Sequence, residues 1–242
     1  MCGICGSWNK EKINKIVDAL SHRGQSCEIS EINNYYLGHL LHSVVGELEQ
    51  PISENGVLSA NCEIYNWKEL NQEYGWETEN DAETLLKLLD KKGTEALNEL
   101  DGIYAFAHVK YGEIIIARDK LGVNPVWYVN NSEEFAFASE KQALEKAGYK
   151  DIRELHPRRI LRYDLEDKKI SFEQREFFEL DVSKNSQSSS KNQKTRGEFS
   201  DDDEIELDEV AEEIKDLFLE AVEKRIPDGD VGLLFSGGLD ST

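Results

Sequence analysis

Residues 1–6 read MCGICG, and the chemistry of this stretch decides how the rest of the chain is interpreted. Its two cysteines, Cys2 and Cys5, could be half of a zinc site, a redox pair, or a nucleophile with a buried neighbour. Structural zinc needs four ligands, usually supplied as two closely spaced pairs, and Cys27 and Cys62 do not form a second pair. A redox C-x-x-C motif usually lies between a strand and a helix N-terminus, not at residue two.

The nucleophile interpretation depends on the removal of Met1, which is usual when a small residue follows it. Cys2 would then carry a free α-amino group, whose ordinary pKa is about 7.7–8.0. That amine can act as the base for the thiol of the same residue, and Gly3 lets a substrate approach the backbone closely. The opening therefore predicts Cys2 as an N-terminal nucleophile, with Cys5 packed beneath a strand. The alternative is that Cys2 is one more buried thiol.

Composition narrows the class of protein. The 242 residues carry a formal charge of −21, and 39% of them are hydrophobic, which suits a globular core. A polyanion does not favour nucleic acid or anionic membrane surfaces as partners. No apolar run approaches the roughly 20 residues that span a bilayer, and no signal-peptide pattern opens the chain. Four cysteines are typical of thiols in a reducing compartment, so we expect a cytoplasmic protein.

The hydrophobic pattern predicts the elements of one domain over residues 1–180. Amphipathic helices are expected over residues 10–20 and after the cap signal Asn80-Asp81, because apolar residues recur there at helical spacing. β-rich runs are expected at residues 4–8, 35–45, 56–65, 102–110, 113–119, 125–130 and 134–139. Grouped strands with few helices between them favour antiparallel sheets. The predicted fold class is therefore α+β, in layers.

The composition changes at about residue 181. Residues 181–204 are rich in Ser, Asn, Lys and Asp and are expected to form a disordered linker. Over residues 205–242 we expect a helix ended by Pro227, then a buried parallel-type strand, VGLLF, leading into SGGLDST. Such a loop presents backbone N–H groups to a pyrophosphate, although it lacks the lysine of a Walker motif. The alternative for SGG is a flexible turn.

Eight motifs occur in order along the chain: MCGICG, SHRGQ, NCEIYN, NDAE, LDGIYAFA, RDKLGVNPVWY, FAFASE and SGGLDS. Together they resemble those of the glutamine-dependent asparagine synthetases, which join a class II amidotransferase domain to an ATP-pyrophosphatase domain. The resemblance implies an N-terminal-nucleophile α/β/β/α sandwich at residues 1–180 and an incomplete α/β PP-loop domain at residues 205–242. Because most of that second domain would lie beyond Thr242, we expect this chain to be the N-terminal part of a longer enzyme, either a fragment or the product of a prematurely ended gene, able by itself at most to hydrolyse glutamine.

The resemblance also implies the site residues. Cys2 would attack the glutamine amide, Asn61 and the N–H of Cys62 would form the oxyanion hole, and Glu63 and Asp81 would hold the ammonium group of glutamine. The further glutamine-binding positions are Val44 and Val45, and the ATP-binding positions are Leu234, Ser236, Gly237, Gly238, Asp240 and Ser241. No metal ligand is expected in this chain. The complete enzyme would use glutamine, aspartate, ATP and Mg²⁺, glutamine hydrolysis itself would need no cofactor, and a homodimer is allowed.

Three positions depart from the family pattern. Leu41 stands where an arginine usually pairs with the α-carboxylate of glutamine, Cys62 replaces a glycine in the oxyanion loop, and Gln25 replaces a proline. We therefore expect weak glutamine binding, and backbone strain if Cys62 must adopt a positive φ. Two alternatives stay open: a related synthetase with another acceptor, as in β-lactam synthetases, or a non-catalytic regulatory relative with a decayed site.

Overall fold

The computed structural model describes residues 1–43, 48–131, 134–176, 201–226, 232 and 234–238, and of residues 201–209 only the backbone. Its chain divides into two units, Met1–Phe178 and Glu179–Thr242, which are described separately.

The first unit contains two six-stranded sheets whose neighbouring strands are all antiparallel. The first sheet has the order β10 (Arg153–Glu154), β8 (Trp127–Asn130), β9 (Phe135–Ala138), β1 (Gly3–Ser7), β3 (Tyr35–Leu41) and β2 (Ser26–Ile32). The second has the order β12 (Ile170–Gln174), β11 (Arg159–Asp164), β7 (Glu113–Arg118), β6 (Gly102–Lys110), β5 (Val57–Ile64) and β4 (Ile52–Ser53). The predicted antiparallel sheets are confirmed.

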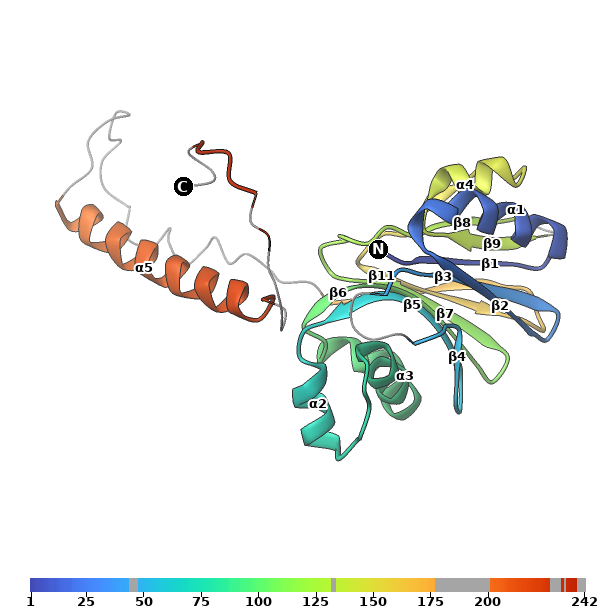
Figure 1. Cartoon of the computed structure of the whole chain (residues 1–242), viewed down its shortest axis with the longest axis horizontal. Helices are drawn as coiled ribbons and strands as arrows, with labels where there is room; N and C mark the ends of the chain where they lie inside the picture. Colours follow the sequence, from blue (N-terminus) through green and yellow to red (C-terminus); the bar gives the residue numbers. More distant parts are fainter. Residues whose placement is uncertain (44–47, 132–133, 177–200, 227–231, 233, 239–242) are drawn as a thin grey trace. The chain divides into compact units, whose positions relative to one another are not determined.

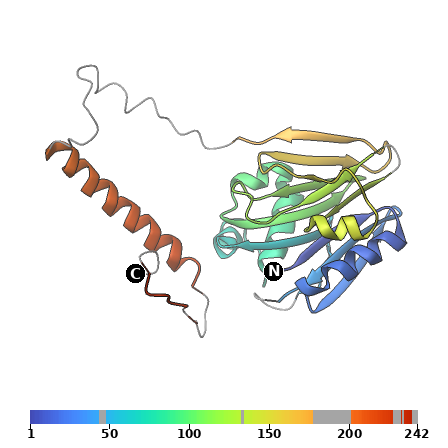
Figure 2. The ribbon, with the colours of Figure 1, turned by 90° about the horizontal axis from the view of Figure 1, so that it is seen from above.

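Helices cover the outer face of each sheet (Figure 1). On the first sheet, α1 (Lys10–Leu20) and α4 (Lys141–Lys146) lie side by side (Figure 2), and on the second lie α2 (Trp67–Tyr74) and α3 (Asp81–Lys92). Two short 3₁₀ turns, η1 (Ser21–Arg23) and η2 (Gly93–Asn98), follow α1 and α3. The unit is therefore the α/β/β/α sandwich that the motifs implied.

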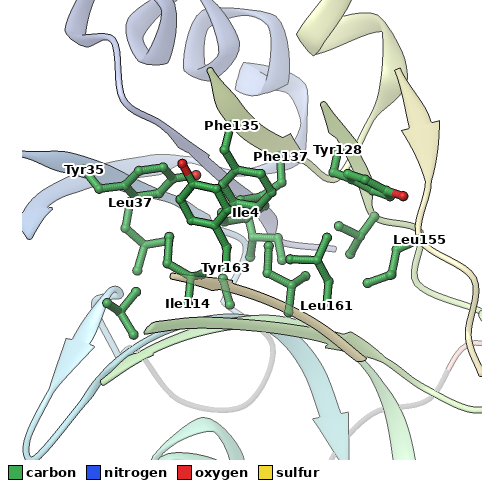
Figure 3. Packing of buried hydrophobic residues seen from close by; sticks show 14 of the residues in the cluster. Ile4, Tyr35, Leu37, Ile114, Tyr128, Phe135, Phe137, Leu155, Leu161 and Tyr163 are labelled. Atoms are coloured by element: carbon green, nitrogen blue, oxygen red, sulfur yellow. The ribbon is translucent and has the colours of Figure 1, made fainter. Parts of the chain in front are cut away.

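The core between the two sheets fixes the position of the chain's N-terminus. Ile4 of the central strand β1 is fully buried there, among aromatic residues that include Phe135 and Tyr163 (Figure 3). The rings of Phe135 and Tyr163 stack with centroids 4.0 Å apart. Each fully buried large apolar side chain contributes about 1.5–3 kcal/mol to stability. The burial of β1 therefore holds Cys2, one residue before the strand, at a fixed place at the end of the first sheet.

The two predicted helices of this unit are confirmed, and their caps explain where they begin. Asn9 accepts a hydrogen bond from the Lys12 N–H at 2.9 Å, at the start of α1. Asn80 accepts one from the Ala82 N–H at 2.7 Å, so α3 begins at Asp81. Side-chain acceptors at this position satisfy N–H groups that have no partner within the helix. The cap of α3 is thus Asn80, which leaves the Asp81 carboxylate available for another role.

The second unit corrects two expectations. Helix α5 runs from Asp201 to Glu223, so residues 201–204, expected in the linker, are helical; residues 181–200 lie outside the described residues. The strand expected at residues 231–235 is absent where the chain is described, and Leu234 and Phe235 are 100% and 61% exposed. A buried parallel strand needs neighbouring strands, and the described residues pair none with this segment. Among the described residues, no helix is long and apolar enough to cross a membrane.

Candidate active site

A pocket lies where the start of β1, the end of β3, the second half of β5 and the N-terminus of α3 meet. β1 pairs with β3 so that Gly3 lies opposite Leu40, which brings Cys2 beside the residues that follow β3. The described residues that line the pocket are Met1, Cys2, Leu41, His42, Ser43, Leu48, Gln50, Ala60, Asn61, Cys62, Glu63, Asn80 and Asp81. The fold thus brings Cys2, Asn61, Cys62, Glu63 and Asp81 together, as the motifs implied, although they come from three separate segments.

The Cys2 thiol is held by the backbone of His42. Its Sγ accepts a hydrogen bond from the His42 N–H at 3.3 Å and lies 3.5 Å from the His42 carbonyl, to which it can donate. Burial raises the pKa of Cys2, and the Asp81 carboxylate adds to the rise. The His42 N–H, the positive N-terminus and Arg23 act in the opposite direction but do not cancel it. A thiol with a raised pKa is mostly protonated at neutral pH, so Cys2 requires a base, and its own α-amine would be the nearest.

The SHRGQ segment lies directly against Cys2. Arg23 Nε donates to the Cys2 carbonyl at 2.9 Å, and Arg23 Nη1 pairs with Glu140 at 2.9 Å. Gly24 allows the SHRGQ segment to lie against the end of β3, because a Cβ there would come within 2.7 Å of the Leu41 N and O atoms. The arginine and the glycine of this motif therefore fix the backbone around the thiol.

One edge of β5 presents three N–H groups toward the pocket. Alternate residues of a strand direct their N–H groups to the same edge. On this edge the Ala60 N–H donates to Gln50 Oε1 at 2.8 Å, and the Ile64 N–H donates to Asp81 Oδ2 at 3.0 Å. The Cys62 N–H lies between them, and the described residues supply no acceptor for it. An unpaired N–H between two paired ones, beside a cysteine, is the arrangement that an oxyanion needs.

The side chains of Asn61 and Cys62 point to opposite faces of β5, as successive residues of a strand do. Asn61 shares its face with Ser59, which hydrogen-bonds to His39 of β3, so Asn61 faces the sheet that carries Cys2. Cys62 packs with the helix layer and hydrogen-bonds to Asp81; burial raises the pKa of the Cys62 thiol well above its ordinary value. Cys62 has no positive φ, so the strain expected from its Cβ does not arise.

The charges around the pocket are mainly negative. The described lining residues include Glu63 and Asp81 but no lysine or arginine, and Leu41 stands in the wall. Burial raises the pKa of Asp81, partly offset by the N–H groups of Ile64 and Ala82 that bond to its carboxylate. The lining suits an ammonium group better than a carboxylate. The predicted glutamine-binding residues Val44 and Val45 lie outside the described residues.

The predicted ATP motif does not form a phosphate cradle in the part that is described. Leu234 and Ser236 lie in neither strand nor helix, Gly237 has φ 72°, and the Gly238 N–H contacts Ser236 Oγ at 3.4 Å. Asp240 and Ser241 lie outside the described residues. Within the described part of the chain, no group of three or more His, Cys, Asp or Glu side chains could hold a metal ion.

Sequence reasoning missed two parts of this site. Gln50 was not predicted, although its side chain occupies the edge N–H next to the candidate oxyanion donor. The backbone of His42, not its ring, holds the Cys2 thiol. Neither contact could be predicted from hydrophobic spacing. Any residue type could supply the backbone N–H at position 42, and a single glutamine does not form a periodic pattern.

Comparison with known proteins agrees with the geometry. The glutamine amidotransferase domain family matches residues 1–193. A probable asparagine synthetase (glutamine-hydrolyzing) of Acanthamoeba polyphaga mimivirus is 31% identical over the whole chain, and asparagine synthetase B (glutamine-hydrolyzing) of Escherichia coli strain K12 is 28% identical over the whole chain. The chain spans only 48% and 44% of the lengths of these two proteins.

A solved structure shares the fold. Glutamine phosphoribosylpyrophosphate amidotransferase from B. subtilis superposes with a TM-score of 0.63 and 22% identity, covering 72% of this chain and 49% of that one. The family match extends over most of the chain, and it includes every residue brought together in the pocket. The chain belongs to the glutamine amidotransferase domain family.

Proposed function

We propose that this chain hydrolyses the side-chain amide of glutamine at Cys2. The Cys2 thiol loses its proton to the α-amine and attacks the amide carbon, which gives a tetrahedral oxyanion. The Cys62 N–H and the Asn61 side-chain amide donate to that oxygen. Its collapse releases ammonia and leaves a thioester on Cys2, which water cleaves to glutamate and free thiol. The observation that carries the proposal is the Cys62 N–H at the edge of β5, beside Cys2, for which the described residues supply no acceptor.

The same pocket would orient the substrate by its ammonium group. Asp81 and Glu63 both line it, and Asp81 is 5% exposed, so its charge is little screened by water. The test of the proposal is the release of glutamate from glutamine by the whole chain, with intact-mass analysis to establish that Met1 is absent. Full removal of Met1 with no glutamate formed would overturn the proposal.

Restoring the missing cation should strengthen glutamine binding. We expect Leu41→Arg to lower the KM for glutamine hydrolysis about tenfold to hundredfold, because a hydrogen bond to a charged group contributes about 1.5–3 kcal/mol. The arginine would supply the charge-assisted pair for the α-carboxylate that this pocket lacks among its described residues. Steady-state kinetics of the two proteins measure the change.

Leu48→Arg is the matched control, since Leu48 lines the same pocket from another segment. An equal fall of KM in both variants would mean that added positive charge, rather than position 41, is responsible. A low KM in the wild type that Leu41→Arg leaves unchanged would show that another group holds the carboxylate, and His42 would be the first to replace.

We further propose that the longer protein couples this ammonia to aspartate, with ATP and Mg²⁺, to make asparagine in the cytoplasm. The order of the motifs up to SGGLDS and the names of the relatives support this reading. Ammonia should then serve better than glutamine as nitrogen source, because we expect the pocket, with Leu41 in its wall, to bind glutamine weakly. The assay is the formation of asparagine and pyrophosphate by the longer protein. ATP turnover with an acceptor other than aspartate would favour the β-lactam-synthetase-like alternative. No ATP turnover with any acceptor would favour a regulatory relative.

A further inference from the structure

The peptide bond that carries the candidate oxyanion donor is held from behind by a buried side chain. Asn124 Nδ2 donates to the Asn61 carbonyl oxygen at 3.1 Å, and Asn124 is only 2% exposed. The Asn61 carbonyl and the Cys62 N–H belong to one planar trans peptide, so they point in opposite directions. The pairing of β5 with β6, in which Asn61 lies opposite Ala105, sets the general direction of this carbonyl, and the Asn124 side chain adds a second hold on it. A group that holds the carbonyl also holds the direction of the N–H. Asn124 does not line the pocket itself.

Hydrogen bonds within the loop between β7 and β8 hold Asn124 in position beside this carbonyl. The Asp119 carboxylate accepts hydrogen bonds from the N–H groups of Val123, at 2.9 Å, and Asn124, at 3.1 Å. The Asp119 N–H donates to the Tyr104 carbonyl of β6 at 2.8 Å, and Asp119 is 3% exposed. Strand β6 lies next to β5 in the sheet. The hydrogen bond to Tyr104 therefore anchors the loop to the same sheet that carries Asn61 and Cys62. The position of Asn124 relative to Asn61 is therefore closely defined.

The hydrogen bond of the Asn124 side chain contributes little net stability to the fold. Its Oδ1 atom is buried and has no partner among the described residues. A buried polar group without a partner costs about 1–3 kcal/mol, which is at least as much as one hydrogen bond contributes. A leucine of similar shape would remove both the bond and the unpaired oxygen, at little net cost. An asparagine that brings no net gain in stability at a buried position points to a role in the site.

We infer that Asn124 is a positioning residue for glutamine hydrolysis: it orients the Asn61–Cys62 peptide so that the Cys62 N–H points at the oxyanion. By accepting this bond, the carbonyl also becomes more polarised, which makes the N–H at the other end of the peptide a stronger donor. The inference rests on the proposed function, because the oxyanion forms only if glutamine is attacked at Cys2.

Asn124→Leu in the whole chain tests it. We expect kcat for glutamine hydrolysis to fall about tenfold to hundredfold, less than the roughly 10²–10³ that follows complete loss of one oxyanion donor. KM should stay within about twofold, because the bound amide has not yet developed the negative charge that the donor stabilises. The ¹⁵N resonance of Cys62 should also shift, since it reports a hydrogen bond to the preceding carbonyl, and this measurement needs no substrate.

Tyr163→Phe is the control for losing the hydrogen bond of a buried side chain. Tyr163 OH accepts from Trp8 Nε1 at 3.0 Å in a part-buried bond, and Tyr163 does not line the pocket. It should leave kcat and the Cys62 resonance unchanged. A wild type without glutaminase activity would overturn the proposed function itself. An active wild type with Asn124→Leu within twofold in kcat would overturn only this inference. So would a variant whose melting temperature and KM change along with kcat, since that result describes a structural role.

Discussion

Replacing Cys2 by alanine is expected to abolish glutamine hydrolysis, with kcat at least about 10³-fold below that of the wild type. The thiol is the only group in the proposed reaction that forms a bond to the substrate, and loss of a nucleophile is among the largest effects of a single substitution. Cys5→Ala should keep most of the activity, because Cys5 is a fully buried residue of β1 that packs with helix α1, and burial raises its pKa far above the ordinary value. Glutamate production by the three proteins measures the difference.

A glutamine analogue that carries a diazoketone provides the second readout. Mass spectrometry should find the label on Cys2 in the wild type and in Cys5→Ala, and no label in Cys2→Ala. Labelling of Cys2→Ala to the same extent as the wild type would end the nucleophile interpretation. A variant that retains Met1 should also be inactive, because the base of the mechanism is then no longer on Cys2. Stoichiometric zinc would instead support the metal interpretation of MCGICG.

The layers of the sandwich could be predicted from the sequence because many of its elements carry a local signal, although the elements α2, α4, β2, β10, β11 and β12 were not predicted. Helix α1 buries Ile13, Ile16 and Leu20, one face of its 3.6-residue period, and the cap of α3 was recognisable at Asn80. The site was predictable for a different reason: the short motifs around Cys2, Asn61 and Asp81 are specific to a family, whereas their spacing in the chain does not indicate that they meet.

The contacts that join these motifs could not be predicted in the same way. Asn124 lies 63 residues from Asn61, and only the fold brings its amide to that carbonyl. Gln50 reaches the edge of β5 through one side chain, with no pattern around it. In VGLLF the described residues, Gly232, Leu234 and Phe235, form no strand, for the opposite reason. The local signal is strong, but a parallel strand is stable only when neighbours pair with it, and local sequence does not contain them.

Asn61→Ala is expected to lower kcat about 10²–10³-fold, which corresponds to about 2.7–4 kcal/mol of lost transition-state stabilisation. Only the side chain is removed, so the Cys62 N–H and the bond from Asn124 to the Asn61 carbonyl stay in place. KM should change little, because the Asn61 amide is proposed to act on the oxyanion rather than on bound glutamine.

Ser59→Ala is the matched control for Asn61→Ala, since Ser59 lies on the same face of β5, is fully buried, and does not line the pocket. Diazoketone labelling of Cys2 should still go to completion in Asn61→Ala, because the thiol itself is intact. A fall in kcat of less than about threefold would mean that the side-chain amide is not an oxyanion donor. The Cys62 N–H would then carry that role alone, and Asn124, which orients it, would become the residue on which the rate depends most after Cys2 itself.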